Sequence, residues 1–180
     1  ATIYVEHHDN PKRKTKYSLI AVEKGDLLIN MDSQAPNKVV GEWLLEKEPF
    51  GKVILLKPEC TYGSSRFDFY LETEAEKIFI EVKGITLEEG GIVRFPDAPT
   101  ERGIKHLEEL RACVEAGYKA AVIFVVQMEG MQHFEPNDKT HPQFGEALRQ
   151  ARKAGVEVLA YECKVTPSSL EISKSIPVVL

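Results

Sequence analysis

The sequence predicts an α/β protein (α+β mixed), in which a mixed sheet is flanked by helices and preceded by a small all-β part. Three observations predict this class. Strand-like segments fill the first thirty residues, three helical segments follow at intervals, and further strand-like segments lie between the helices. This order, with hairpin strands first and crossover helices later, is typical of a mixed sheet covered by helices.

The first part of the chain is expected to form three short strands over residues 2–6, 17–22 and 26–29, with a tight turn at Lys24-Gly25-Asp26. A three-stranded sheet of this size is marginally stable by itself. We therefore expect it to pack on the rest of the chain, and we predict a β subdomain over residues 1–35 and a main domain over residues 36–180.

In the main domain, helices are expected over residues 36–48, 100–117 and 143–154, where apolar residues recur at helical spacing. Strands are expected over 53–57, 66–72, 77–83, 118–127 and 156–161, with a hairpin around Glu89-Gly90-Gly91. The run from Ala120 to Val126 is apolar and rich in β-branched residues, so it predicts a strand buried on both faces.

The composition limits the class of protein. A length of 180 residues suits one domain with a small appendage, and a net charge of −5 restricts any nucleic-acid binding to a local basic patch. The three cysteines show no Cys-x-x-Cys pairing, which favours a reducing cytoplasm. No apolar run approaches the roughly 20 residues of a membrane helix, so we expect a cytoplasmic protein without membrane contact.

The strongest chemical signal lies on two consecutive predicted strands. Side chains alternate across a strand, so Asp68 points away from its buried phenylalanine neighbours, and Glu81 and Lys83 share one face of the next strand. The short segment 73–76 lets the strands pair, which brings Asp68 beside Glu81. The acidic-x-Lys triplet alone is a weak signal, since a second one stands at 162–164, and the aspartate on the preceding strand distinguishes the first.

Two carboxylates held side by side favour a cation between them, and oxygen ligands suit a hard divalent ion such as Mg²⁺ or Mn²⁺. Asp68 and Glu81 are therefore the predicted metal ligands. Lys83 would orient an attacking water and offset the charge of a phosphate in phosphodiester hydrolysis. The residues alone leave open the alternative that Asp68, Glu81 and Lys83 form a cross-strand ion-pair ladder on a solvated face.

A wider set of motifs resembles the sugar fermentation stimulation protein family and extends over nearly the whole chain. The motifs are Asn10-Pro-Lys-Arg-Lys14, Ser64-Ser-Arg-Phe-Asp-Phe69, Glu81-Val-Lys83, Phe95-Pro-Asp-Ala98 followed by Thr100, Arg102, Gly103, Lys105, His106 and Leu107, Phe124-Val-Val-Gln127, and Gly155-Val-Glu-Val-Leu-Ala-Tyr161.

The resemblance implies a PD-(D/E)xK restriction-endonuclease-like domain, DNA binding, and a role in regulating sugar utilisation. It also implies an OB-like barrel at the start, of which this chain retains only the last strands. Whether the missing start reflects truncation or a naturally short member is left open by the residues.

Several residues are weaker candidates for the same site. Arg102, Lys105 and His106 are expected to share one side of the second long helix, where they would meet DNA phosphates or form an ordinary solvated face. Asp97 would cap that helix or assist the metal, and Gln127, at the end of a buried strand, needs a hydrogen-bond partner.

Glu42, on the first helix, would complete the metal site or lie on the surface as a plain charge. The run of Lys12, Arg13, Lys14 and Lys16 is the best candidate for sequence-independent phosphate contact. The other four histidines show no metal-ligand spacing with cysteine and are expected on the surface; they are His7, His8, His133 and His141.

Three functions remain open from the sequence. The leading one is a cytoplasmic DNA-binding protein with a Mg²⁺-dependent nuclease domain, motivated by Asp68, Glu81 and Lys83. The second is a non-catalytic DNA-binding regulator of sugar utilisation with a vestigial site, and the third is an interaction module that binds no nucleic acid. The sequence leaves the oligomeric state open, a homodimer included, as well as the preferred DNA sequence and strandedness.

Overall fold

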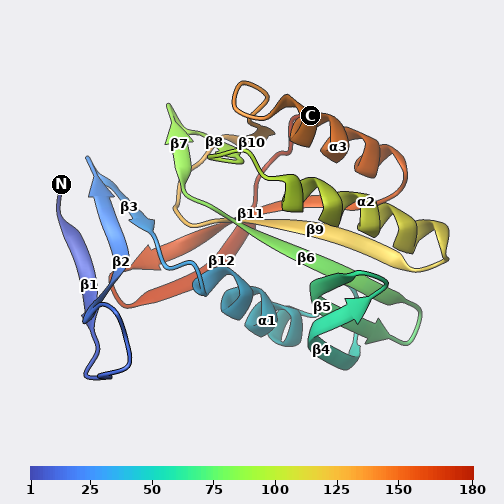
Figure 1. Cartoon of the computed structure of the whole chain (residues 1–180), viewed down its shortest axis with the longest axis horizontal. Helices are drawn as coiled ribbons and strands as arrows, with labels where there is room; N and C mark the ends of the chain where they lie inside the picture. The colour runs from blue at the N-terminus through green and yellow to red at the C-terminus, as the bar shows by residue number, and fades with distance from the viewer.

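The computed structural model describes residues 1–180 and contains three helices and three sheets. A six-stranded mixed sheet has the order β12-β11-β9-β6-β5-β4, and two three-stranded sheets have the orders β1-β2-β3 and β10-β8-β7. Figure 1 shows the β1-β2-β3 sheet at one end of the molecule and the helices against the large sheet. The predicted class, a mixed sheet flanked by helices after a small β part, is confirmed.

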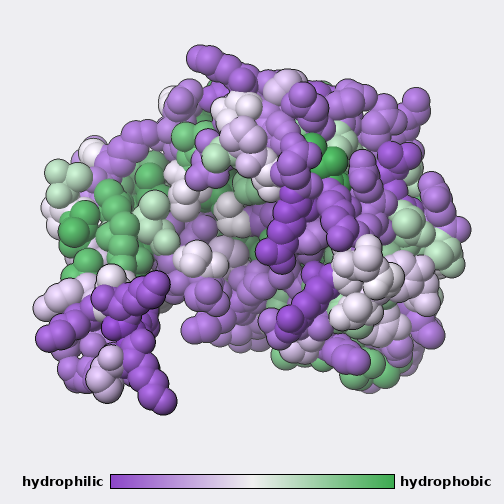
Figure 2. Space-filling view, viewed as in Figure 1, coloured by the Kyte–Doolittle hydropathy of each residue, from purple (hydrophilic) through white to green (hydrophobic).

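The N-terminal sheet is antiparallel and consists of β1 (Ile3–His7), β2 (Tyr17–Lys24) and β3 (Leu27–Asn30). Gly25 turns β2 into β3 with a φ of 61°, a conformation that glycine adopts without steric cost. Ile29 of β3 belongs to the core of the main domain, so this sheet is anchored along β3. The other two strands are less covered, and Figure 2 shows hydrophobic surface at this end of the molecule; Ile3 and Val5 of β1 and Leu19 of β2 are exposed.

The large sheet combines both strand directions. Strands β4 (Val53–Tyr62), β5 (Ser65–Thr73) and β6 (Lys77–Ile85) follow one another as antiparallel neighbours. Strand β9 (Lys119–Val126) lies parallel to β6, and β11 (Glu157–Thr166) lies parallel to β9. Strand β12 (Ser169–Ser175) closes the other edge as an antiparallel neighbour of β11. The parallel pairs require long crossovers, which the second and third helices provide.

The helices cover the two faces of this sheet. Helix α1 (Ala35–Lys47) buries Val40 and Leu44 against one face, in a core that contains Ile80 of β6. Helices α2 (Glu101–Glu115) and α3 (Pro142–Lys153) pack on the opposite face, in a core that contains Phe79 and Phe124. Strands β6 and β9 are therefore buried on both faces, as the apolar run through Val126 predicts.

The third sheet consists of β7 (Leu87–Glu89), β8 (Ile92–Phe95) and β10 (His133–Pro136). Strands β7 and β8 form the hairpin expected around Gly90, and β10 pairs with β8 in parallel. Neither β10 nor β12 is predicted from the sequence. Ile172 is the one β-branched residue that they contain, and both are held by their neighbours in the sheet rather than by local preference.

The expectation that His141 lies on the surface is wrong, because the residue is 5% exposed. Its Nδ1 accepts a hydrogen bond from the main-chain nitrogen of Thr100 over 3.1 Å. Thr100 is the residue that caps α2, and its hydroxyl accepts a hydrogen bond from Gly103 N. His141 is thus buried between the starts of α2 and α3 as a partner for the polar backbone there.

None of the three helices combines the length and the apolar composition that a membrane crossing requires.

Candidate active site

The candidate site begins where β5 separates from β6. The two strands pair from Phe69 opposite Ile80 to Glu72 opposite Lys77, and Asp68 comes immediately before this ladder. Instead of a main-chain pair, Oδ2 of Asp68 accepts a hydrogen bond from Val82 N over 2.7 Å. The carboxylate thereby satisfies a strand N–H that would otherwise lack a partner, and it is held next to the residue that follows Glu81.

A second contact fixes the other oxygen of the same carboxylate. The side-chain amide of Asn37, in the first turn of α1, donates to Oδ1 of Asp68 over 2.8 Å. Asn37 is not predicted from the sequence. The sequence shows only an amide side chain in the first turn of a predicted helix. The contact between Asn37 and Asp68 depends on how α1 packs against the sheet, which the local sequence does not reveal.

Glu81 lies inside the protein with two nitrogen groups against it. It is 3% exposed, and its Oε1 is 2.8 Å from Lys83 Nζ and 2.6 Å from Nδ1 of His106. The same nitrogen of His106 lies 3.3 Å from Lys83 Nζ. Strand alternation places Glu81 and Lys83 on the face that α2 covers, and α2 supplies the histidine.

The two oxygens of Glu81 are therefore in different environments. Oε1 has two nitrogen neighbours, whereas Oε2 is buried and has no hydrogen-bond partner. Burial acts to raise the pKa of Glu81, but the hydrogen bond from His106 and the charge of Lys83 outweigh it and lower the pKa below its ordinary value. The side chain is consequently a carboxylate with one uncommitted oxygen.

The two acidic residues influence one another. Burial, followed by the negative charge of Glu81, raises the pKa of Asp68, although its hydrogen bonds from Val82 and Asn37 act in the opposite direction. The charge of one carboxylate therefore disfavours ionisation of the other, which is the electrostatic situation that a bound cation relieves.

The alternative of an ion-pair ladder on a solvated face does not fit this environment, because Glu81 and His106 are buried. The donor set has two carboxylates, and no group of three or more His, Cys, Asp and Glu side chains is arranged to hold a metal ion. The uncommitted Oε2 of Glu81 and the coupling to Asp68 fit a hard cation that completes its shell with water or phosphate oxygens.

The three candidates on α2 separate in the structure. His106 is 6% exposed and faces Glu81, whereas Arg102 and Lys105 are exposed, so the expectation that all three share one side is wrong. The reason is that His106 adjoins the buried Leu107 on the sheet-facing stripe of the helix. Lys105 forms an ion pair along the helix, with 3.6 Å between its Nζ and Oε1 of Glu109.

The remaining supporting candidates lie apart from the carboxylates. Glu42 is exposed and lines a hollow of about 640 Å³ between α1, the N-terminal sheet and the β11–β12 turn. Asp97 is exposed and lies before the helix cap, which is provided by Thr100. Neither residue is brought to Asp68 by any hydrogen bond or ion pair in the structure.

Gln127 is 3% exposed and joins the N-terminal part to the centre of the sheet. Its amide nitrogen donates to Oδ1 of Asn30 over 2.8 Å and to the main-chain oxygen of Asp32 over 3.1 Å. A Cβ placed on Gly84 would lie 2.5 Å from Oε1 of Gln127. The buried amide therefore has its partners, and it abuts the residue that follows Lys83.

The basic run lies in the connection between β1 and β2, and all four of its residues are exposed: Lys12, Arg13, Lys14 and Lys16. Figure 2 shows a hydrophilic projection at this end of the molecule, beneath the apolar surface of the N-terminal sheet. Arg13 donates to Ser18 Oγ over 2.8 Å, and none of the four basic side chains forms an ion pair with a carboxylate. Their charges are therefore available to a negatively charged partner.

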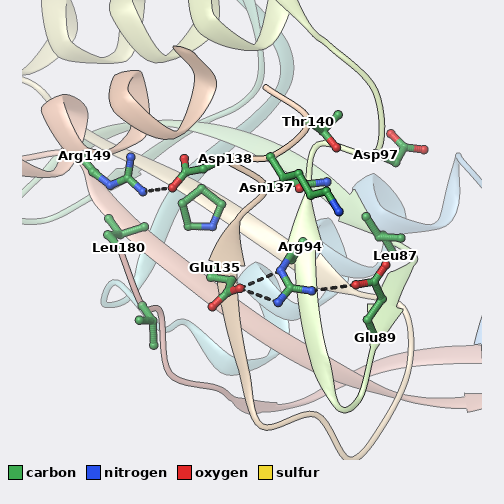
Figure 3. Close-up of a pocket in the computed structure, with 13 residues that line it drawn as sticks. Leu87, Glu89, Arg94, Asp97, Glu135, Asn137, Asp138, Thr140, Arg149 and Leu180 are labelled. Carbon is green, nitrogen blue, oxygen red and sulfur yellow. Dashed lines mark hydrogen bonds and ion pairs between the residues drawn. The ribbon is translucent and has the colours of Figure 1, made fainter. Parts of the chain in front are cut away.

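Another hollow, of about 830 Å³, lies away from the two acidic residues. Figure 3 shows Arg94 at its centre, with ion pairs to Glu135 and Glu89 at 2.7 and 3.2 Å, and Arg149 paired with Asp138. These charged groups are paired with one another, and neither this hollow nor the one beside Glu42 contains Asp68, Glu81 or Lys83. The candidate site is consequently defined by its polar contacts and not by the size of a cavity.

Comparison with protein families matches residues 34–169 to the "Sugar fermentation stimulation protein RE domain" and residues 1–31 to the "SfsA N-terminal OB domain". The chain belongs to the sugar fermentation stimulation protein family. The resemblance stated from the sequence motifs is thereby confirmed, and so is the OB-like character of the first strands.

Relatives within the sugar fermentation stimulation protein family are similar over the whole chain. A homologue from Clostridium beijerinckii is 57% identical over 180 residues, which are 100% of this chain and 80% of the homologue. One from Desulfitobacterium hafniense is 55% identical over 179 residues, or 99% of this chain and 78% of that protein. A solved structure described as Pyrococcus furiosus SfsA in complex with Ca²⁺ has a TM-score of 0.85 and 27% identity, covering 99% of this chain and 78% of the other.

Proposed function

We propose that this member of the sugar fermentation stimulation protein family is a DNA-binding protein whose main domain hydrolyses phosphodiester bonds with Mg²⁺ or Mn²⁺. The observation that carries the proposal is that Asp68 of β5 accepts a hydrogen bond from Val82 N of β6, the main-chain nitrogen between the paired side chains of Glu81 and Lys83. The contact from Val82 N to Asp68 at 2.7 Å and the ion pair from Lys83 to Glu81 at 2.8 Å hold this arrangement.

Asp68 and Glu81 are the residues that would hold the cation. Glu81 supplies a buried oxygen without a partner, and each oxygen of Asp68 has one donor and retains acceptor capacity for a second contact. A bound divalent cation polarises a phosphoryl oxygen and lowers the pKa of its water. The description of the Pyrococcus furiosus relative as a complex with Ca²⁺ supports a site for hard divalent cations in this family.

Lys83 contributes positive charge at a fixed position. Its ammonium group is held by Oε1 of Glu81, and the side chain is only 16% exposed, so its charge is partly shielded from water. A cation held in this way stabilises the negative charge that accumulates on a phosphate as water attacks, and it orients that water by donating a hydrogen bond. These are the two roles that we assign to Lys83 in hydrolysis.

DNA is the proposed partner because exposed, unpaired basic side chains project from the β1–β2 connection at Lys12, Arg13, Lys14 and Lys16. Phosphate contacts by such side chains release condensed counterions and give affinity without sequence specificity. Arg102 and Lys105 add exposed positive charge on α2, the helix that also carries His106. We place the protein in the cytoplasm, since its three cysteines form no disulfide.

A second candidate function is a non-catalytic DNA-binding regulator of sugar utilisation. Both oxygens of Asp68 already accept hydrogen bonds within the chain, and no third acidic or histidine ligand completes the set. In this case the carboxylate would be structural, and binding that weakens steeply with salt would occur without cleavage.

Incubation of supercoiled plasmid with the protein and Mg²⁺ separates the two functions. The native chain is expected to nick the plasmid, whereas Asp68→Ala and Lys83→Ala are expected to lose at least the 10²-fold that one electrostatic group commonly contributes. A Glu115→Gln variant, altered at an exposed acid on α2, serves as the control and should cleave normally. Absence of cleavage of both DNA and RNA, with binding retained, would favour the regulator.

A further inference from the structure

We propose that His106 is a positioning residue, whose Nδ1–H, together with Lys83, fixes Glu81 by its Oε1 and leaves Oε2 as the oxygen presented to a cation. The orientation of Glu81 follows from contacts within the chain. The use of Oε2 for a cation rests on the proposed function.

The position of one proton follows from two distances. Nδ1 of His106 is 2.6 Å from Oε1 of Glu81, a separation that requires a proton between the two atoms. Lys83 also donates to this oxygen, and two donors at one atom favour the charged form of the carboxyl group. The proton therefore resides on Nδ1 of the imidazole.

The approach of Lys83 to the same ring is not a competing hydrogen bond. An ammonium group has donors only, and Nδ1 cannot accept from it while it carries the proton for Glu81. The separation of 3.3 Å is the distance between two donors that converge on one acceptor. Oε1 is thus the shared acceptor, and this leaves Oε2 buried and without a partner.

The surroundings of His106 restrict its movement. The ring is 6% exposed and lies beside Phe67, with 6.5 Å between ring centroids. Its helix is anchored by Leu107 and Leu110 in the core and capped at the start by Thr100. Because His106 is fixed on α2, it fixes the orientation of Glu81 in turn. Residues that hydrogen-bond to a metal ligand orient that ligand in the same way in known metal sites.

Other possible roles of His106 would use the other nitrogen of its ring. As a metal ligand, a proton acceptor or a contact to phosphate it would act through Nε2, whereas positioning requires only the donor at Nδ1. The side-chain nitrogen of asparagine occupies a place near Nδ1, and that of glutamine occupies a place near Nε2. His106→Asn should therefore restore the donor to Glu81, and His106→Gln should not.

The first measurement uses the full chain without added metal. Long-range ¹H–¹⁵N spectra of the imidazole ring report which nitrogen carries the proton, and His106 is expected to be protonated at Nδ1. The same spectra of Glu81→Gln should show a change confined to His106, with the exposed His7 as an internal reference. An Nε2–H tautomer in the native chain would overturn the inference, whatever the protein does to DNA.

The second measurement is calorimetric titration with Mn²⁺. His106→Ala and His106→Gln are expected to bind Mn²⁺ about 10–100-fold more weakly than the native chain, the usual effect of losing an outer partner, and His106→Asn is expected to bind within a few-fold of it. Rescue by glutamine and not by asparagine would overturn the positioning role. If no variant binds Mn²⁺ and the native chain does not either, the proposed function fails while the Nδ1 tautomer stands.

Discussion

The side-chain amide of Asn37 donates a hydrogen bond to Oδ1 of Asp68 over 2.8 Å, which ties the first turn of α1 to the start of β5. The residues are 31 positions apart in the chain, and Asn37 is the side chain of α1 that reaches the candidate site. A neutral amide is suited to this place, because the pKa of Asp68 is already raised by burial and by Glu81.

Substitution Asn37→Asp should destabilise the cation-free protein, because it replaces a donor to Asp68 with a third negative charge. We expect a loss of about 1–3 kcal/mol, from the missing hydrogen bond and the added repulsion, or roughly 3–10 °C in melting temperature for a chain of this size. Addition of Mg²⁺ should recover most of the loss, and thermal unfolding with and without Mg²⁺ measures both effects.

The control for this experiment is Gln34→Glu, which adds a negative charge at the exposed start of the same helix. A charge there interacts favourably with the helix dipole, and Gln34, unlike Asn37, has no hydrogen bond with Asp68. Equal responses of the two variants to Mg²⁺ would mean that Asn37 is not beside a cation site.

Glu81 should make stability depend on pH in a definite direction. Its pKa in the folded protein lies below the ordinary value of 4.5, since the contacts with His106 and Lys83 outweigh burial. A carboxylate with a lowered pKa stabilises the fold above its unfolded pKa, and this contribution is lost as pH falls through the folded value.

The native chain should therefore be more stable than Glu81→Gln by a constant amount from neutral pH down to the ordinary glutamate range, and the difference should narrow below it. Urea unfolding of both proteins over this pH range provides the test. A difference that widens on acidification would show that Glu81 is protonated in the folded protein near neutral pH.

The basic run should determine the salt dependence of DNA binding. Replacement of Lys12, Arg13, Lys14 and Lys16 by alanine is expected to weaken binding and to reduce the slope of log K against log salt by up to about 3–4 units, near 0.9 for each phosphate that the variant no longer neutralises. The matched control replaces three lysines and one arginine at exposed sites elsewhere, namely Lys139, Arg152, Lys153 and Lys164. Equal slopes for both quadruple variants would remove the β1–β2 connection from the DNA interface.

Gly84 and Gln127 should be energetically coupled. A methyl group at position 84 would lie 2.5 Å from Oε1 of Gln127 and 2.8 Å from Cγ of Pro36, so Gly84→Ala is expected to cost about 1–3 kcal/mol. The cost should fall in a Gln127→Ala background, because the nearer clash disappears. Chemical unfolding of the two single variants and the double variant measures the coupling, and strictly additive effects would contradict it.

Local patterns in the sequence are sufficient for the main strands and for the faces of β6, but not for β5, where Phe67 and Phe69 are expected on one face and lie in different cores. Alternation predicts that Glu81 and Lys83 share a face, and helical spacing predicts all three helices to within two residues at each end. Both predictions use the periodicity of side chains along the backbone, and this periodicity can be recognised within a single helix or strand.

The parts that escape prediction depend on contacts between distant elements. Asn37 meets Asp68 only after α1 packs on the sheet, and His106 is buried because α2 turns that side toward Glu81. The residues around His141 in the sequence do not indicate that it is buried, because its hydrogen-bond partner is the main-chain nitrogen of Thr100, 41 residues away. Strands β10 and β12 likewise depend on pairing with their neighbours in the sheet.

The most direct test of a shared cation site is calorimetric titration of Mg²⁺ and Mn²⁺ into the native chain, Asp68→Asn, Glu81→Gln and the exposed control Glu115→Gln. We expect one site in the native chain and in the control, and binding weakened at least 10-fold in each of the two site variants, because each removes one of the two carboxylates that would hold the ion. Affinity unchanged in both site variants, or absence of binding by the native chain, would contradict the conclusion that Asp68 and Glu81 hold a cation together.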